Sequence, residues 1–231
     1  MQTTIYHLVD GAKQAKGATV IIDVFRAFSV EAYLCAKGAE KIIPVGDMQI
    51  AYDQKEIDPQ TVLIGERKGV MLPGFDFGNS PTEIQNTDFT GKTVVHTTSA
   101  GTQGVANATG ADVIFGASLV NAKATAEYIK KMGYETVSIV AMGLLGSRQS
   151  DEDELCAKYI KSVLDGNEID ITNEIEQLKY TFGAKFFDEE KQNVYPKDDF
   201  FYCTALNKFN FVMKIEKDEN TGFCVTKRID L

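Results

Sequence analysis

The chain of 231 residues is long enough to bury one large or two small hydrophobic cores without disulfides or structural metals. With 44% hydrophobic and 25% charged residues, its composition is typical of a globular protein. The formal net charge of -9 argues against nucleic acid or an anionic membrane as a partner and favours a small molecule, which a local basic pocket can still bind if it is an anion.

The cysteines are widely spaced and form no Cys-x-x-Cys pair: Cys35, Cys156, Cys203 and Cys224. Three of them stand within apolar runs, which favours buried free thiols in a reducing compartment over a disulfide framework. No apolar run approaches the length of a membrane span, and the first residues lack the continuous apolar core of a signal peptide. We therefore expect a cytoplasmic protein.

Strands and helices alternate along most of the chain. We expect a strand over residues 4–9, a strand over 18–24, a helix over 29–37, a strand over 41–45, a helix over 47–55 and a strand over 61–64. A glycine-rich, charged loop follows, from Gly65 to Pro81. After it we expect a strand over 92–97, a helix of small residues ending near residue 110, a strand over 112–115, a helix over 121–132, a strand over 136–141 and an acidic helix over 151–164.

This alternation predicts an α/β fold with a largely parallel or mixed sheet. The last part of the chain has a different pattern: a helix over 170–187, a polar excursion over 191–200, and two strands over 210–215 and 223–229 that form a C-terminal hairpin. We interpret residues 1–231 as a single domain. Two similar lobes that share the sheet, at about residues 1–85 and 86–231, stay open as an alternative, although no linker separates them.

Polar side chains follow the predicted strands at four places, and open α/β sheets bind ligands at the carboxyl ends of their strands. Asp23 and Arg26 stand at the end of the second predicted strand. Glu66 and Arg67 follow the strand over 61–64, at the start of the glycine-rich loop, and Asp76 lies later in the same loop. Carboxylates are hard ligands for a divalent cation, and arginine binds phosphate through several N–H donors. The alternatives are an ion pair at a helix start and a solvated surface loop.

The other two places precede helices. Residues 97–102, TTSAGT, offer hydroxyls and free main-chain N–H groups, which suit either an anion site or simple capping of the helix. Glu152 and Asp153 stand on the first turn of the acidic helix, where they are candidate metal ligands or charges that complement the helix dipole.

Carboxylates, arginines, hydroxyls and glycines together predict a magnesium site that handles a phosphorylated small acid. The chain has no Walker phosphate loop, no G-x-G-x-x-G and no thiolate phosphatase loop. Its only histidines are His7 and His96, and His96 lies in an apolar strand, where we expect a core histidine. Catalytic triads and histidine-rich zinc sites are therefore disfavoured.

At these positions the sequence resembles the 2-phosphosulfolactate phosphatase family. The matching segments are Ile22–Ala27 (IDVFRA), Gly65–Arg67 (GER), Gly74–Pro81 (GFDFGNSP), Thr97–Thr98 with Gly101–Thr102, and Glu152–Asp153 with Ala157. The resemblance implies a three-layer α/β/α fold and Mg²⁺-dependent hydrolysis of a phosphate ester on a sulfonated hydroxy acid, in the setting of coenzyme M biosynthesis. The pocket that it implies consists of Asp23, Arg26, Glu66, Arg67, Asp76, Asn79, Thr98, Gly101, Thr102, Glu152 and Asp153.

We therefore predict a phosphatase of a small phosphorylated, sulfonated or carboxylated hydroxy acid. Metal ligands are expected among Asp23, Glu66, Asp76, Glu152 and Asp153. Arg26 and Arg67 are expected to bind the phosphate and the second acid group. Substrate donors are expected from Asn79, Thr98, Ser99, Gly101 and Thr102.

Several alternatives stay open at this level. Attack by water is the first mechanism, and a covalent aspartyl-phosphate at Asp23 is the second. A related magnesium-dependent hydrolase or lyase of another phosphorylated acid is the rival within enzymes, and a non-catalytic anion-binding protein is the rival outside them. A homodimer is expected from the general frequency of two-fold oligomers.

Overall fold

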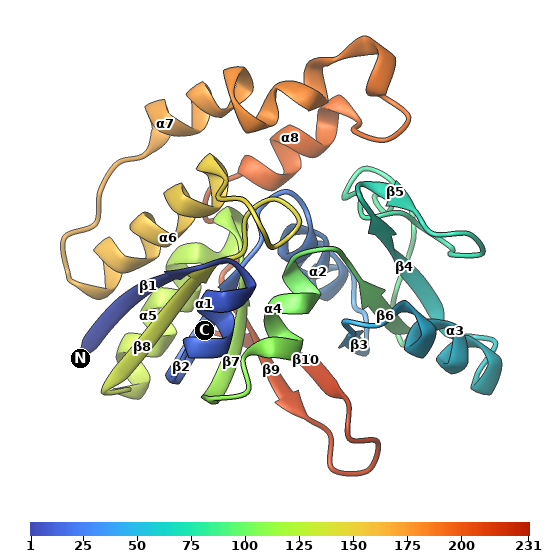
Figure 1. Cartoon of the computed structure of the whole chain (residues 1–231), viewed down its shortest axis with the longest axis horizontal. Helices are drawn as coiled ribbons and strands as arrows, with labels where there is room; N and C mark the ends of the chain where they lie inside the picture. The colour runs from blue at the N-terminus through green and yellow to red at the C-terminus, as the bar shows by residue number, and fades with distance from the viewer.

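Figure 1 shows the computed structural model, which describes residues 1–231. The strands are β1 (Gln2–His7), β2 (Gly17–Ile22), β3 (Lys41–Pro44), β4 (Val62–Arg67), β5 (Val70–Met71), β6 (Thr93–Thr97), β7 (Ala111–Ala117), β8 (Thr136–Ala141), β9 (Phe211–Lys217) and β10 (Cys224–Asp230). The α-helices are α1 (Leu8–Gln14), α2 (Ala27–Ala36), α3 (Met48–Ile57), α4 (Gly101–Asn107), α5 (Ala122–Met132), α6 (Asp151–Leu164), α7 (Thr172–Gln177) and α8 (Lys197–Thr204).

All ten strands belong to one mixed sheet, in the order β1-β8-β2-β7-β9-β10-β3-β6-β4-β5. Strands β1, β8, β2 and β7 form one parallel set, and β3, β6 and β4 form another. The antiparallel hairpin β9–β10 lies between the two sets and pairs with β7 on one side and β3 on the other. The predicted α/β class, mixed sheet and C-terminal hairpin are confirmed, and the hairpin lies in the middle of the sheet.

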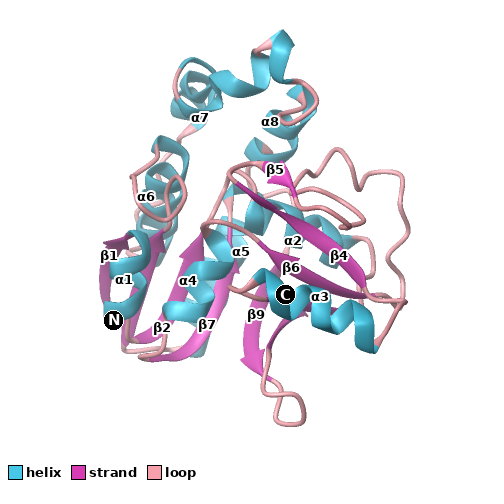
Figure 2. Ribbon diagram, turned by 45° about the vertical axis from the view of Figure 1, so that its right-hand side comes forward, coloured by secondary structure: helices cyan, strands magenta, loops and turns pink.

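Helices cover both faces of the sheet, which gives the three layers of the fold (Figure 2). Strand β2 shows why: Ile21 packs in a core with α1, α2 and α4, whereas Val20 and Ile22 pack in the opposite core with α5 and α6. All three side chains are fully buried, and each contributes about 1.5–3 kcal/mol by leaving water. A strand that is apolar on both faces must be covered on both, as the unbroken apolar run predicts.

Residues 172–204, which we call the cap segment, run above the carboxyl ends of the first strand set (Figure 1). They comprise α7, the 3-10 helices Leu178–Tyr180, Phe182–Phe187 and Glu189–Lys191, and α8. A small core of Leu178, Phe186 and Phe200 holds the cap segment together, and Phe25, which follows β2, packs against this core. The cap segment is thereby attached to the loop that follows β2.

Three predictions of local structure were wrong or incomplete. Helix α1 was missed because Gly11 and its neighbours carry no helical pattern; a Cβ there would lie 2.9 Å from Tyr6 Cβ, so packing requires the glycine. The helix expected over 170–187 is broken into α7 and two 3-10 helices. The polar excursion expected over 191–200 contains the start of α8, where Pro196 at the cap and the acidic first turn favour a helix.

The other expected helices and strands are present, with shifts of a few residues at their ends. The four cysteines are free, and three of them are buried as expected. No helix of this structure is both long enough and apolar enough to cross a membrane.

Candidate active site

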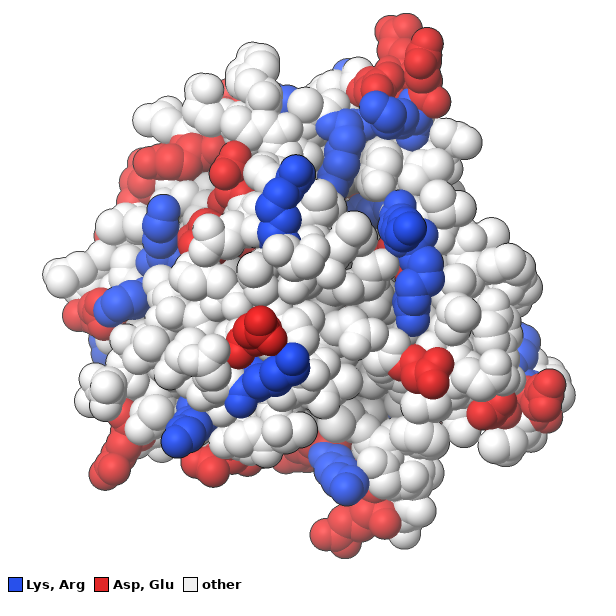
Figure 3. Space-filling model, viewed as in Figure 1, with Lys and Arg blue, Asp and Glu red and all other residues white.

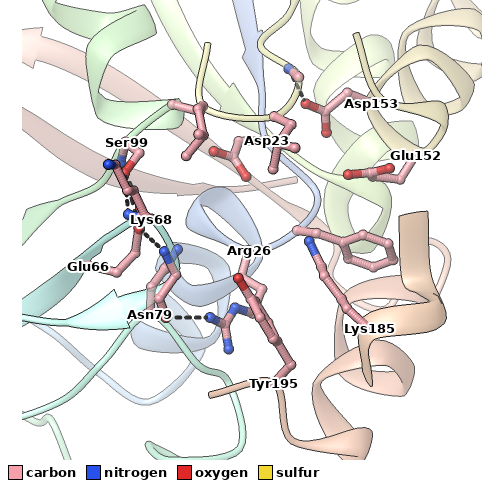
Figure 4. Close-up of a pocket in the computed structure, with 16 residues that line it drawn as sticks. Asp23, Arg26, Glu66, Lys68, Asn79, Ser99, Glu152, Asp153, Lys185 and Tyr195 are labelled. Carbon is pink, nitrogen blue, oxygen red and sulfur yellow. Dashed lines mark hydrogen bonds between the residues drawn. The ribbon is translucent and has the colours of Figure 1, made fainter. Parts of the chain in front are cut away.

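Strand ends from both halves of the sheet meet beneath the cap segment. The loops after β2, β4, β6 and β8 and two residues of the cap segment enclose a cavity of about 270 Å³, which we call the active-site pocket (Figure 4). It is lined by Asp23, Phe25, Arg26, Glu66, Lys68, Gly69, Asn79, Ser99, Ala100, Gly143, Leu144, Leu145, Glu152, Asp153, Lys185 and Tyr195. The Gly101 N–H after β6 reaches Asp23 Oδ2 after β2 at 2.8 Å, so the carboxyl ends of the two strand sets meet here.

The carboxylate of Asp23 is fixed by the main chain. Its Oδ1 accepts the Ala27 N–H at 3.1 Å, and its Oδ2 accepts the Gly101 N–H. A Cβ at position 101 would lie 2.7 Å from Ala27 Cβ and 3.0 Å from Asp23 Oδ2, so only glycine allows this approach. Asp23 therefore links the start of α2 to the start of α4, and these two hydrogen bonds fix the orientation of its carboxylate.

Asp153 and Glu66 make the same kind of link at the two flanks of Asp23. Asp153 accepts the Val24 N–H at 2.8 Å and the Gly143 N–H at 2.7 Å. Glu66 accepts the Ser99 N–H at 2.7 Å, the Ser99 hydroxyl at 3.1 Å and the Gly69 N–H at 2.5 Å. Asp153 thus links the loop after β2 to the loop after β8, and Glu66 links the loop after β4 to the loop after β6. Together the two carboxylates hold four strand ends at one site.

Glu152 is the exception among the four carboxylates of the pocket. Its Oε2 is buried and has no hydrogen-bond partner. Burial raises the pKa of Glu152 to about 7, an effect that the positive charge of Lys185 opposes. Burial raises the pKa of Asp23 to about 6 and, with the charge of Glu152, that of Asp153 well above its usual range. A buried carboxylate without a partner is costly, and a bound cation would supply the missing charge.

No three His, Cys, Asp or Glu side chains of the chain are gathered closely enough to form a ready-made metal cluster. The donor set nevertheless fits a hard cation such as Mg²⁺, because Glu152 lines the same cavity as Asp23 and its Oε2 has no hydrogen-bond partner. Mg²⁺ is commonly held by one or two carboxylates, with water and substrate oxygens completing its shell.

The main cation of the pocket floor is Arg26, which is almost fully buried. Its Nη1 donates to Asp199 Oδ2 at 2.7 Å and to the Val194 carbonyl at 2.9 Å. Asp199 in turn accepts from Ser80 Oγ at 2.8 Å and from both the N–H and the hydroxyl of Thr82. The cap segment therefore holds Arg26 in place through a buried ion pair.

The structure brings together seven of the residues that the sequence singled out: Asp23, Arg26, Glu66, Asn79, Ser99, Glu152 and Asp153. Figure 4 shows Asp23 between Glu66 and Ser99 on one side and Glu152 and Asp153 on the other. These side chains come from the ends of separate strands, which the topology of the sheet places at one location.

Five other predicted residues do not line the pocket. Arg67 donates to the Gly46 carbonyl and to Thr97 Oγ1 instead. Thr98 and Thr102 bond to each other at the start of α4, and Gly101 lies behind Asp23.

Asp76 also lies away from the pocket. Its Oδ2 accepts from the Leu63 N–H at 2.8 Å and from Lys55 Nζ at 3.2 Å. Leu63 precedes Glu66 by three residues on β4, a separation of about 10 Å along a strand. The expectation that Asp76 and Glu66 share a metal is therefore corrected by the course of the loop, which folds back along β4.

Three groups of the site have no signal in the sequence: Lys185, Tyr195 and Asp199. A fourth, Lys68, belongs to the charged, glycine-rich loop that the sequence does indicate, where it is a candidate anion-binding residue, and its φ is 56°. The other three belong to the cap segment, whose path over the sheet has no local signal in the sequence. A buried acid such as Asp199 is recognisable only once its partner Arg26 is placed.

A buried polar chain connects the pocket to the C-terminal hairpin. Asn79 Oδ1 lies 3.2 Å from His96 Nε2, and His96 Nδ1 lies 3.0 Å from Glu31 Oε1. The Thr226 hydroxyl of β10 donates to Glu31 Oε2 at 2.8 Å. His96 is thus a satisfied core histidine, as the sequence predicts.

Replacing Thr226 by valine is expected to lower the free energy of unfolding by about 1–3 kcal/mol, because Glu31 Oε2 loses its only donor inside the core. Urea unfolding measures the change. Thr19→Val is the matched control: Thr19 is also a buried strand threonine, but its hydroxyl makes only a 3.5 Å contact to Gly17 O. Equal losses in the two variants would contradict the role given to the Thr226 hydroxyl.

An α/β sheet whose converging strand ends carry carboxylates and cations around one small cavity defines a protein that binds a small, charged molecule there. A family model described as 2-phosphosulpholactate phosphatase matches residues 4–218. The chain therefore belongs to the 2-phosphosulfolactate phosphatase family, a family of phosphoric monoester hydrolases, and the resemblance seen in the sequence is confirmed.

Curated relatives agree with this assignment. The chain is 33% identical over 201 residues to a probable 2-phosphosulfolactate phosphatase of Bacillus subtilis (strain 168). The aligned region covers 86% of this chain and 87% of that protein. It is 34% identical over 212 residues to a protein of the same description from Caldicellulosiruptor saccharolyticus, with 90% and 84% covered. A third, from Clostridium perfringens (strain SM101), is 33% identical over 215 residues, with 87% and 86% covered.

Proposed function

We propose that this protein is a magnesium-dependent phosphatase that hydrolyses 2-phosphosulfolactate to sulfolactate and phosphate. The observation that carries the proposal is the free, buried Oε2 of Glu152 in a pocket that it shares with Asp23 and Arg26. Membership of the family supports the ester as substrate, since the relatives bear that activity in their names.

The charges of the pocket support a cation requirement. The lining has four carboxylates and only three cationic side chains, and Arg26 is already paired with Asp199. A substrate with phosphate, carboxylate and sulfonate groups is strongly anionic. Such a molecule would be repelled by the carboxylates of the pocket, and a divalent cation held by them would offset this repulsion.

Glu152 is the first residue proposed to hold the ion, because its Oε2 has no hydrogen-bond partner. Asp23 is proposed as the second, because it lines the same cavity and each of its oxygens accepts a single main-chain N–H bond, which leaves a lone pair for the ion. Bound Mg²⁺ supplies charge neutralisation for the phosphoryl oxygens and acidifies a water molecule. Arg26 binds the phosphoryl group through the N–H groups that Asp199 and Val194 leave available.

Direct attack by water is favoured over a covalent aspartyl-phosphate by the surroundings of Asp23. Both of its carboxylate oxygens accept main-chain N–H bonds, at 3.1 and 2.8 Å, and its side chain is almost fully buried. Each bond uses a lone pair of an oxygen that would otherwise attack phosphorus, so a covalent step would weaken that bond. A phosphorylated Asp23 trapped during turnover would contradict this mechanism.

Phosphate release from 2-phosphosulfolactate is expected with magnesium and not with excess chelator. Glu152→Gln is expected to weaken magnesium binding, measured by calorimetry without substrate, by at least about tenfold. Glu154→Gln is the matched control: it is two residues away on α6, pairs with His7, and does not line the pocket. Equal magnesium affinity of wild type and Glu152→Gln would contradict the proposed ligand.

Assays with other phosphate esters distinguish this function from the alternative enzyme activities and from a non-catalytic binding protein. Release from 2-phospholactate or 3-phosphoglycerate alone would keep the chemistry and change the substrate. Binding of phosphate or sulfonate without release from any ester would identify a non-catalytic anion-binding protein.

A further inference from the structure

Asn79 carries the only side-chain amide that lines the active-site pocket. Its position in the chain is fixed, because the hydroxyl of the next residue, Ser80, donates to the buried Asp199 Oδ1 at 2.8 Å. The freedom that remains is rotation of the amide group itself. One protein group is bonded to that amide: His96, whose Nε2 lies 3.2 Å from Asn79 Oδ1. The orientation of the amide in the pocket therefore depends on His96.

The other end of the amide opens to the cavity. Asn79 Nδ2 donates to no group of the protein, yet it is not fully buried, although the residue as a whole is only 5% exposed. An amide has one acceptor edge and one donor edge, so a bond from His96 to Oδ1 turns the donor edge toward the pocket. A phosphoryl dianion offers only acceptor oxygens, and a donor is therefore the group that it needs there.

Behind Asn79, His96 and Glu31 form a buried pair. Acidic side chains stand in solvent across the face shown in Figure 3, whereas Glu31 lies within α2 and is fully buried. Its Oε1 lies 3.0 Å from His96 Nδ1, and its Oε2 accepts from the Thr226 hydroxyl at 2.8 Å. A buried pair of this kind is seldom more stable than apolar side chains of the same size, which points to a role other than stability.

The charge of the pair decides which protons His96 carries. One proton lies between Nδ1 and Glu31 Oε1, on either atom. With a second proton on Nε2, the pair as a whole is neutral. Without it, the pair has a full negative charge inside the core, which is costly. The reverse orientation, with Asn79 Nδ2 donating to a bare Nε2, leaves that charge uncompensated and turns an acceptor toward the bound anion.

We propose that His96 is a positioning residue for phosphate binding: its Nε2–H holds Asn79 Oδ1, so that Asn79 Nδ2 donates to the phosphoryl group. Glu31 keeps Nε2 protonated by balancing its charge, and Thr226 of β10 holds Glu31. This role rests on the proposed function and adds a neutral donor to the binding of the phosphoryl group. It also gives the central hairpin a part in shaping the pocket.

The protonation of His96 can be read directly, because the chain has only two histidines. In the His7→Gln variant, long-range ¹H–¹⁵N correlation spectra contain the ring of His96 alone. His7 is partly exposed, pairs with Glu154 and does not line the pocket, so its replacement leaves the network in place. A protonated, pyrrole-type Nε2 is expected without substrate. A pyridine-type Nε2 would overturn the proposal, because Asn79 would then present its oxygen to the pocket.

A mutant cycle separates positioning from a purely structural role. The variant Glu31→Leu/His96→Met/Thr226→Val, which we call the network variant, replaces the buried polar chain with apolar side chains and leaves no buried charge unpaired. Its kcat/KM for 2-phosphosulfolactate is expected to fall about tenfold or more, as is that of Asn79→Ala. Because both changes remove the same donor, combining them is expected to lower kcat/KM less than about threefold further. Losses that multiply would overturn the proposal.

Thr125→Val is the matched control for loss of a buried hydrogen bond. Its hydroxyl donates to the Asn121 carbonyl at 2.9 Å, and Thr125 is fully buried and does not line the pocket. Its kcat/KM is expected to stay within about threefold of wild type. A loss in Thr125→Val equal to that of the network variant would overturn the specific role of His96.

Binding of inorganic phosphate keeps the positioning role separate from the reaction. If wild type releases no phosphate from any ester, the proposed function fails, and the same cycle is read on phosphate affinity, measured by calorimetry with magnesium present. A loss of affinity shared by Asn79→Ala and the network variant would support the positioning role. Losses that multiply, or no binding of phosphate by wild type, would overturn it.

Discussion

The Asp23→Asn variant is expected to lose at least about a thousandfold in kcat for phosphate release at saturating magnesium, with its fold intact. Asparagine has the shape of aspartate, and its carbonyl oxygen can still accept one of the N–H bonds from Ala27 and Gly101. What it removes is the charge that the proposed cation requires. Phosphate release and magnesium calorimetry measure the two consequences separately.

Asp76→Asn is the control for this experiment. Asp76 was predicted from sequence as a metal ligand, but it contacts Leu63 and Lys55 outside the pocket. The kcat of this variant is expected to stay within about threefold of wild type. Loss of the Asp76 charge is expected to change only the free energy of unfolding, and only modestly. Activity in Asp23→Asn equal to that of Asp76→Asn would remove Asp23 from the chemistry.

Asp199→Ala is expected to lower the free energy of unfolding by about 3–5 kcal/mol, because it leaves the Arg26 guanidinium buried without its counter-ion. Ser80 and Thr82 lose their acceptor in the same step. Because Arg26 is then free to move, kcat/KM is also expected to fall. Urea unfolding monitored by circular dichroism measures the stability change.

Asp165→Ala is the control for the ion pair. Asp165 pairs with Lys161 on the surface of α6, where both side chains are more than a third exposed, and its loss is expected to cost less than about 1 kcal/mol. Comparable losses in the two variants would show that the Arg26–Asp199 pair has no special weight. Asp199→Asn, which keeps an acceptor for Ser80, is expected to fall between the two.

The part of the site that lies at strand ends was predictable from the sequence. Asp23, Glu66, Ser99 and Glu152 each follow an apolar run or open a helix, and the topology of α/β sheets places such positions together. The fold class was predictable because the spacing of apolar residues along each segment indicates which face of a helix or strand is buried.

The rest depended on how segments pass over one another. Lys185 and Tyr195 reach the pocket because the small aromatic core of the cap segment packs on Phe25, a contact between residues more than 150 positions apart. Asp76 and Arg67 were misplaced for the opposite reason, since nearness in sequence to Glu66 does not fix the direction in which a side chain points. Long-range packing of this kind leaves no periodic signal.

The position of the hairpin β9–β10 has a consequence for how the protein is made. Because the hairpin lies between the two parallel strand sets and follows both in the chain, the strands that join the halves of the sheet leave the ribosome after the strands that they join. Until residues 211–230 emerge, β7 and β3 each present an open edge to other chains. Loss of the hairpin would therefore divide the sheet at its centre. Loss of an edge strand from a sheet, by contrast, leaves the remaining strands paired.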